Sequence, residues 1–241
     1  MRVVVCTVGI SGWYPGAVAR MVKRFGENSP GYEIQAHINV LPFGAPKDVI
    51  EDGASYTGYC AKPFALLQSR MSGADIAILL DAAYYPIRHI GPLVEYISRN
   101  GYYLHKNGQK VGEWVSDRCL SRMGINRDES IMTQDEIGSG CVGLNFSNGV
   151  CTELIHEWCG YAATGVAFAG PRDALTLTPG QPGFVSTDPR VKGHRNDQSV
   201  LSILTRRLGM TKLSEQPLFT AYKGSETGKT VLVNHGGGAK W

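Results

Sequence analysis

The chain has 241 residues, of which 43% are hydrophobic and 19% are charged, and its formal net charge is +3. These values are typical of a folded globular protein with one large core, and they exclude an intrinsically disordered chain. The net charge is too small to indicate a nucleic-acid-binding protein by itself, although it permits a local basic groove.

The chain contains no segment with the length and hydrophobicity of a transmembrane helix. The apolar run at 1–8 is too short for a secretory signal sequence, and no small-residue cleavage site follows it, so a first core strand is expected. The six cysteines form no Cys-x-x-Cys pair, and several lie in apolar elements, which indicates buried, reduced thiols. We therefore expect a cytoplasmic protein without membrane association.

Strands and helices alternate in the first half of the chain. In order, the pattern predicts a strand at 1–9, a helix at 16–25, a strand at 32–40, a helix at 57–71, a strand at 76–81, a helix at 88–99 and a short strand at 101–105. Apolar residues recur about every 3.6 positions in the predicted helices and every 2 positions in the exposed strands. This alternation favours an α/β fold with a mixed, mostly parallel sheet flanked by helices.

The second half is less regular. The predicted elements are helices at 114–123, 149–163 and 197–208 and a strand at 141–146. The segment 169–193, rich in glycine, proline and threonine, is long for a connection without secondary structure, and such segments often form lids or binding loops. No change in composition marks a second domain, so residues 1–241 are expected to form one domain.

Asp81 directly follows an apolar run at 76–80. A continuous apolar run is typical of a strand buried on both faces of a parallel sheet, and open α/β sheets bind ligands at the carboxyl ends of their strands. Asp81 is therefore a candidate for holding a metal ion, a ribose hydroxyl or, through a metal, a diphosphate. The alternative is an Asp that stabilises the following turn, where this residue is favoured.

Two segments before Asp81 are candidates for the same site. The first strand ends at Thr7, Val8 and Gly9, where a glycine-rich turn without the spacing of a dinucleotide site or a P-loop either contacts a nucleoside or is a plain tight turn. Lys62 lies near the start of a predicted helix, where the helix dipole favours anions. It therefore serves a bound anion or is simply solvated.

Two later segments carry further candidates. Asp197 and Gln198 begin the last predicted helix, where a carboxylate and an amide either hold ligand hydroxyls and supply a general base or simply cap the helix. His235 follows an apolar strand and precedes three glycines, and its imidazole can join a carboxylate on a transition metal. Gly238 permits close approach of the backbone to a ligand, and Lys240 supplies a point charge for phosphate. The alternative for this segment is a frayed terminus.

Taken together, these segments resemble the nucleotide-sugar glycosyltransferases of the GT-A fold. In that family a helix that opens with a Lys-Pro pair precedes an apolar strand ending in an Asp-x-Asp motif, some members have an Asp-Gln pair at a later helix start, and a C-terminal motif supplies a metal-binding His and a diphosphate-binding Lys. The matching residues are Lys62-Pro63, Asp81, Asp197-Gln198, and His235 with Lys240. The likeness covers most of the chain in the order of its elements and rests on these four short motifs.

The resemblance implies a GT-A-like, Rossmann-related domain in which residues 1–105 bind the nucleotide and residues 106–241 bind the acceptor. It implies sugar transfer from a nucleotide sugar, with UDP-sugars favoured, to a hydroxyl of a saccharide, a protein or a modified DNA base. The implied donor-binding residues are Thr7, Val8, Gly9, Lys62, Asp81, Ala83, Gly238 and Lys240. The implied catalytic residues are Asp197, Gln198 and Asp135, with Glu136 beside the last as a further acid, and the implied ligands of Mn²⁺ or Mg²⁺ are Asp81 and His235.

The chain departs from the family at Ala83, where the second carboxylate of the Asp-x-Asp motif is expected. With Asp81 and His235 alone, a divalent ion needs diphosphate oxygens and waters to complete its shell. The alternative is transfer without a metal, in which basic side chains neutralise the leaving diphosphate. The candidates for that role are Lys62, Arg195 and Lys240.

Other interpretations stay open at this stage. The basic run of Arg190, Lys192 and Arg195 permits DNA as the acceptor, whereas a solvated surface explains these charges equally well. A nucleotidyltransferase that makes sugar nucleotides is one alternative function, although the turn at 9–16 lacks the basic residue that such an enzyme would carry there. A non-catalytic module that binds nucleotide sugars is the other. The sequence decides neither between inversion and retention nor the oligomeric state.

Overall fold

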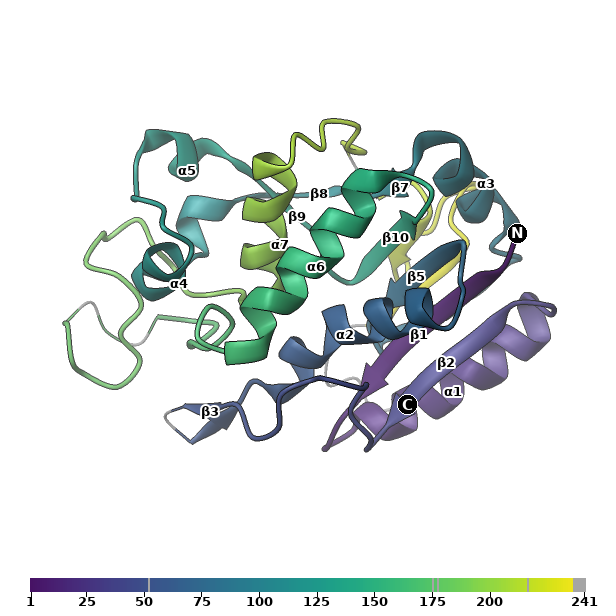
Figure 1. Cartoon of the computed structure of the whole chain (residues 1–241), viewed down its shortest axis with the longest axis horizontal. Coiled ribbons are helices and arrows are strands. Elements are labelled where there is room, and N and C mark those ends of the chain that lie inside the picture. Colours follow the sequence, from purple (N-terminus) through teal and green to yellow (C-terminus); the bar gives the residue numbers. More distant parts are fainter. Residues whose placement is uncertain (52, 175, 177, 216, 236–241) are drawn as a thin grey trace.

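The computed structural model describes residues 1–51, 53–174, 176, 178–215 and 217–235, and at its centre is a five-stranded sheet of order β2-β1-β5-β10-β7 (Figure 1). The strands are β1 (Val3–Gly9), β2 (Glu33–Ile38), β5 (Ile76–Leu80), β7 (Tyr102–Tyr103) and β10 (Cys141–Asn145). β2, β1 and β5 are parallel, whereas β10 is antiparallel to β5 and β7. The predicted mixed, mostly parallel sheet is confirmed.

Helices cover both faces of this sheet. One face carries α1 (Tyr14–Asn28) and α3 (Gly91–Asn100), and the other carries α2 (Thr57–Met71), α6 (Gly149–Thr164) and α7 (Asn196–Arg207). Side chains along the fully buried β5 point alternately to the two faces of the sheet, so the strand contributes to the core on both sides. Ile76, Ile78 and Leu80 pack toward α1 and α3, while Ala77 and Leu79 pack toward the other face. Full burial of one large aliphatic side chain stabilises the fold by about 1.5–3 kcal/mol.

The remaining elements are short. They are the hairpin of β3 (Ile50–Glu51) and β4 (Ala54–Ser55), the strands β6 (Tyr84–Pro86), β8 (Lys106–Lys110), β9 (Asp135–Ile137), β11 (Thr220–Tyr222) and β12 (Leu232–Asn234), the 3-10 helix η1 (Val111–Glu113), and the helices α4 (Asp117–Arg122) and α5 (Glu129–Thr133). β6, β12 and β11 form a second sheet of order β11-β12-β6, and β8 pairs with β9. The strands β6, β8, β9 and β12 are held by pairing with distant segments, which sequence periodicity does not reveal.

The predicted helix at 114–123 is wrong in its extent. The helix present there, α4, begins at Asp117, and the turn before it is η1. Ser116 has an extended backbone, and its hydroxyl accepts a hydrogen bond from the backbone N–H of Cys119 at 3.1 Å. This is the geometry of an N-cap residue, so local capping sets the helix start and overrides the apolar periodicity upstream of it.

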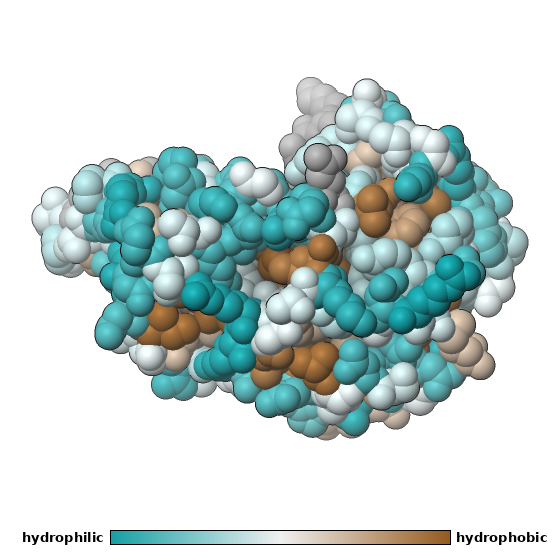
Figure 2. Space-filling model, turned by 90° about the horizontal axis from the view of Figure 1, so that it is seen from above, coloured by the Kyte–Doolittle hydropathy of each residue, from teal (hydrophilic) through white to brown (hydrophobic). Residues whose placement is uncertain are grey.

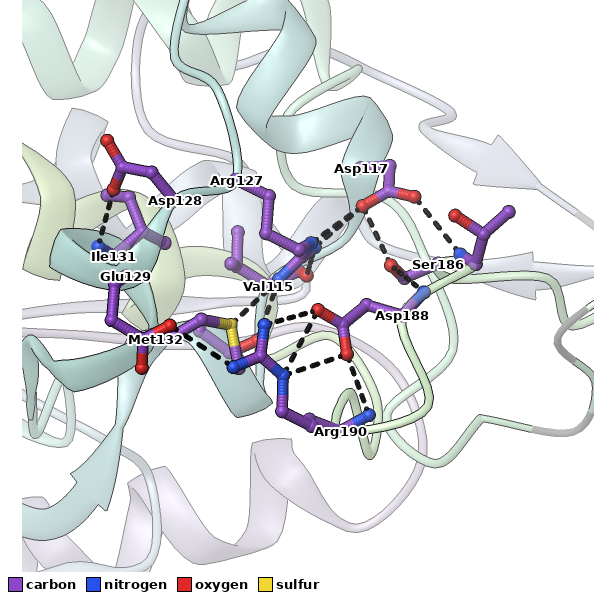
Figure 3. Close-up of polar contacts among 12 residues, drawn as sticks. Val115, Asp117, Arg127, Asp128, Glu129, Ile131, Met132, Ser186, Asp188 and Arg190 are labelled. Atoms are coloured by element: carbon purple, nitrogen blue, oxygen red, sulfur yellow. Dashed lines mark hydrogen bonds and ion pairs between the residues drawn. The ribbon is translucent and has the colours of Figure 1, made fainter.

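The long segment 169–193 is tied to α4 and α5 by polar contacts (Figure 3). The Asp117 carboxylate, at the start of α4, accepts a hydrogen bond from the Ser186 hydroxyl at 2.8 Å. The Arg190 guanidinium lies 3.3 Å from the Glu129 carboxylate at the start of α5. Segment and helices therefore form one polar network at the end of the molecule farthest from β2 in Figure 1.

Three features bear on the surroundings of the protein. In the part of the chain that the structure describes, no helix has the length and apolar character needed to cross a bilayer. On the face seen in Figure 2, apolar residues form separate patches among hydrophilic ones. All six cysteines are buried and unpaired, which confirms the predicted buried thiols.

Candidate functional site

Three of the predicted site residues meet at the carboxyl edge of the central sheet. Lys62 comes from α2, Asp81 from the end of β5 and Asp197 from the first turn of α7. The Lys62 ammonium nitrogen lies 2.5 Å from Asp81 Oδ1 and 2.8 Å from Asp197 Oδ2. One lysine thus joins two carboxylates that are far apart in the sequence, and we call these three residues the ionic triad.

Asp81 is the exposed member of the ionic triad. Its side chain is 34% exposed, compared with 13% for Lys62 and 3% for Asp197. The Asp81 backbone N–H donates to the carbonyl of Gly140 at 2.9 Å, which fixes the residue just past the sheet edge. A Cβ atom at Gly140 would lie 2.9 Å from the Tyr84 ring and 3.2 Å from Asp81 Oδ2, so only glycine allows this close approach.

Asp197 is held by an unusual backbone conformation at the start of α7. The preceding residue, Asn196, has a φ of 46°, in the left-handed region that non-glycine residues seldom adopt. Its buried side-chain amide donates to the carbonyls of Phe168 and Gly170 at 2.7 and 3.1 Å. The N-cap position belongs to Arg195, so the carboxylate of Asp197 does not cap the helix and binds Lys62 instead. Strained, well-anchored residues of this kind are typical of ligand sites.

Two members of the ionic triad, Lys62 and Asp197, have shifted pKa values. Burial disfavours the ammonium of Lys62, but the charges of Asp197 and then Asp81 outweigh that effect and raise its pKa. Burial raises the pKa of Asp197, and Lys62 opposes this shift. Lys62 therefore carries its charge at neutral pH and screens the repulsion between the two carboxylates. Asp81 contacts Lys62, and Asp197 contacts Lys62 and Ser139, so each carboxylate keeps acceptor positions that can bind hydroxyl groups.

The end of β1 lies along the same edge. The Thr7 side chain is fully buried, and its hydroxyl has no hydrogen-bond partner among the described residues. Val8 is half-buried, in contact with the core on the α2 face. Close packing requires glycine at position 9, because a Cβ atom there would lie 2.7 Å from the Val18 side chain and 3.0 Å from the carbonyl oxygen of Tyr14.

A second polar cluster adjoins Asp197 through Gln198. The side-chain oxygen Oε1 of Gln198 accepts a hydrogen bond from the backbone N–H of Ser139 at 3.3 Å. The Gln198 side chain also contacts Glu136. The carboxylate of Glu136 has no exposed surface and accepts from Asn107 at 2.6 Å and from Arg195 at 3.2 Å. Burial raises the pKa of Glu136. Glu136 was expected only as a further acid beside Asp135, after Asp197, although its buried environment is the one that favours a proton acceptor.

Asp135 faces away from this cluster. It shares β9 with Glu136, and neighbouring residues of a strand point to opposite sides. Its carboxylate lies 2.5 Å from the Lys110 ammonium and 2.9 Å from that of Lys106. These two hydrogen bonds, the one from Lys110 first, lower the pKa of Asp135. The contacts of Asp135 thus place it with β8 and not with the ionic triad.

The predicted metal ligands are not arranged as a metal site. The His235 backbone N–H donates to the carbonyl of Ala83 at 3.2 Å, so His235 lies beside the turn that follows Asp81. Asp81, however, is paired with the Lys62 ammonium, and Ala83 has no side-chain ligand atom. In the described ranges, no three His, Cys, Asp or Glu residues are grouped so as to hold a metal ion. The described residues thus offer a divalent cation one carboxylate, already paired with Lys62, and one imidazole, so most of its ligands would come from a diphosphate and water.

The C-terminal part of the predicted site is described only as far as His235. Its imidazole lies 5.1 Å from the Tyr85 ring. Burial, followed by the charges of Lys223 and Arg20, lowers the pKa of His235. The other two predicted residues of this segment, Gly238 and Lys240, lie outside the described residues.

Comparisons with known proteins address the fold. No protein-family model and no curated protein matches the sequence. Among solved structures, the chain is similar to a glycosyltransferase involved in the glycosylation of the major capsid of PBCV-1, with a TM-score of 0.51 and 10% identity over 97% of this chain and 93% of that one. It also matches the bifunctional glycosyltransferase WbbM, with a TM-score of 0.48 and 10% identity over 98% of this chain and 46% of that one. At 10% identity the likeness to the PBCV-1 protein is one of fold, and it extends along nearly the whole length of the chain.

Proposed function

We propose that the protein is a glycosyltransferase that moves a sugar from a nucleotide sugar to an acceptor hydroxyl. The observation that carries the proposal is the ionic triad, in which Lys62 holds Asp81 and Asp197 together at the carboxyl edge of the sheet. Ligands of open α/β sheets bind at this edge, and this chain has the fold of a glycosyltransferase. A buried ammonium between two carboxylates offers both donors and acceptors to sugar and ribose hydroxyls.

The proposed roles of the site residues follow from their positions along the sheet edge. The ionic triad and the end of β1 lie where a nucleotide sugar would bind, with Thr7, Val8 and Gly9 near the nucleoside. Lys62 orients both carboxylates, so that Asp81 and Asp197 accept hydrogen bonds from donor hydroxyls. The proposed boundary between a nucleotide-binding part (1–105) and an acceptor-binding part (106–241) passes between Asp81 and Asp197. We also propose a UDP-sugar as the donor.

Glu136 is the proposed proton acceptor if the reaction inverts. Its pKa is raised by burial, which brings a carboxylate closer to the range suited to general-base catalysis. Gln198 links it to Asp197, so an acceptor hydroxyl bound between them would face the donor sugar. Asp135, the other acid considered on this strand, is neutralised by Lys106 and Lys110.

The partners of the basic run favour a saccharide or a protein over DNA as the acceptor. Arg190 binds Asp188 at 2.7 Å, and Lys192 binds Glu113 at 2.9 Å. Cations that already have carboxylate partners contribute less to phosphate binding than unpaired ones. The six buried, unpaired cysteines support a reducing compartment, so we also propose a cytoplasmic location.

The proposed activity is tested by incubating the whole chain with a panel of nucleotide sugars and measuring free nucleoside diphosphate, with and without Mn²⁺. We expect release from at least one donor, by transfer to an added acceptor or by slow transfer to water. Binding of a donor without any release would identify a non-catalytic module. Formation of a nucleotide sugar from a sugar phosphate and a nucleoside triphosphate would identify a nucleotidyltransferase.

A further inference from the structure

A hollow of about 450 Å³ lies between α1 and the second sheet (β11-β12-β6), and basic side chains line both of its sides. Arg20, Lys23 and Arg24 of α1 line one side, and Lys223, which follows β11, lines the other. Glu27 is the acidic residue of the lining, and its carboxylate lies 3.2 Å from the Arg24 guanidinium. The hollow thus collects basic side chains from two elements that are far apart in the sequence.

The basic side chains on α1 are close neighbours. Arg20 lies three positions before Lys23 and four before Arg24, a spacing that places side chains next to one another on a helix. Lys223 brings a further positive charge to the same hollow from a different element. Convergent cations around a concave surface focus a positive potential, which raises the local concentration of anions and favours their binding.

The position of the hollow relates it to the proposed donor site. Ala82 and Ala83, the turn directly after Asp81, line the hollow together with His235. Ala82 packs against Ala17 on the α1 side, while Asp81 reaches Lys62 of α2 on the other side of the sheet. A ligand that passes over this turn would therefore contact the ionic triad at one end and the basic hollow at the other.

We propose that the hollow binds the diphosphate of the nucleotide sugar, with Arg20, Lys23 and Lys223 providing the positive charge. The inference rests on the proposed function and extends it. At this turn Ala83 provides no side-chain ligand, and the Asp81 carboxylate is already paired with Lys62. Guanidinium groups bind phosphate oxygens in pairs, and ammonium groups act as point charges, so the lining chemistry suits two adjacent phosphates. The diphosphate is thus held by side chains of α1 and of the segment after β11.

The test is calorimetric titration of the whole chain with inorganic pyrophosphate in the presence of EDTA. We expect binding by the wild-type protein and an affinity roughly tenfold lower in Arg20→Gln and in Lys223→Gln, because each loses one charged contact to phosphate. Lys229→Gln is the matched control, since Lys229 is also exposed but lines a separate, mainly apolar hollow with Arg88. We expect its affinity to equal that of the wild type. Circular dichroism establishes that each variant is folded.

Three outcomes would overturn the inference. The first is equal pyrophosphate affinity in the wild type, Arg20→Gln and Lys223→Gln, and the second is binding that appears only when Mn²⁺ is added. The third is binding of inorganic phosphate as tight as that of pyrophosphate, which indicates a site for a single phosphate group. The experiment involves no turnover. If pyrophosphate binds as expected and no nucleotide sugar is cleaved, the anion site stands and the proposed function fails. If nucleotide sugars are cleaved and the variants bind pyrophosphate normally, the proposed function stands and this inference fails.

Discussion

At the scale of single residues, Lys62 is the centre of the site because it is the cation that both carboxylates share. Its ammonium lies within 2.8 Å of Asp81 and of Asp197, and 5.7 Å from the centre of the Tyr59 ring. A lysine in this position separates two acids that would otherwise repel one another in a poorly solvated site. It also holds Asp197 in place from a different helix, so the geometry of the site depends on it.

Replacing Lys62 by methionine tests this role. The variant keeps the length of the side chain but leaves two carboxylates without their cation, and loss of one partner of a buried ion pair costs about 3–5 kcal/mol. We expect urea unfolding to show a destabilisation of that order, together with loss of donor cleavage. Lys110→Met is the control, because Lys110 pairs with Asp135 near the surface, where an ion pair contributes about 0–1 kcal/mol. Equal stability of the two variants would show that Lys62 has no such role.

The position of a residue in the sequence predicts some of these site contacts and not others. Asp81 was identifiable because it directly follows the apolar strand β5, and Lys62 because it precedes Pro63 in the helix before that strand. The choice between Asp135 and Glu136 was not, because neighbouring strand residues face opposite sides and the register of β8 and β9 depends on distant pairing. The left-handed conformation of Asn196 is equally invisible, since two distant carbonyls stabilise it.

At the scale of elements, local signals decide which boundaries the sequence predicts. The helix expected at 149–163 is present as α6, where Asn148 accepts a hydrogen bond from Val150 at one end and Gly165 adopts the left-handed conformation at the other. The helix expected at 114–123 is shorter, because Ser116 is the N-cap residue and the helix begins after it, at Asp117. β8, rich in polar residues, and the three-residue β9 have no apolar pattern, so only their tertiary pairing reveals them.

The connection between the long segment and α4 gives a prediction at this scale. Asp117 accepts hydrogen bonds from Ser186 and from the backbone of Thr187, at 2.8 and 3.2 Å (Figure 3). Asp117→Ala removes both, so we expect faster cleavage within residues 178–193 in limited proteolysis. Asp128→Ala is the control: it removes the N-cap of α5, at a cost of about 1 kcal/mol, without touching this segment. The prediction fails if both variants are cleaved at the same rate in this segment.

At the scale of the whole molecule, buried neutral histidines set the response to acid. His194 is fully buried, its Nδ1 accepts from the backbone N–H of Ser116 at 3.3 Å, and its Nε2 donates to the carbonyl of Ala167 at 3.0 Å. Burial lowers the pKa of His194 to about 4. Burial likewise lowers the pKa of His105 to about 4. In the unfolded chain both imidazoles take up a proton near pH 6.5.

Because the unfolded state binds more protons than the folded state between these values, stability falls as the pH is lowered from about 6.5 to 4. A difference of this size corresponds to about 3 kcal/mol for one histidine. We expect His194→Gln to lose less stability than the wild type over this range, as measured by urea unfolding at a series of pH values. The exposed His89 provides the control variant, His89→Gln. A parallel pH dependence in the wild type and His194→Gln would contradict this account.

The fold brings together a site whose parts come from α2, β5 and α7, and the central claim is that this site cleaves the donor. The most direct measurement is kcat/KM for release of nucleoside diphosphate by Asp81→Asn and by Asp75→Asn. The two aspartates flank the same strand, and Asp75 lies at the opposite edge of the sheet beside Arg2. The account predicts a loss of roughly a hundredfold or more for Asp81→Asn, a size typical of removing a group that stabilises the transition state, and wild-type activity for Asp75→Asn. Equal activity of the two variants would contradict it.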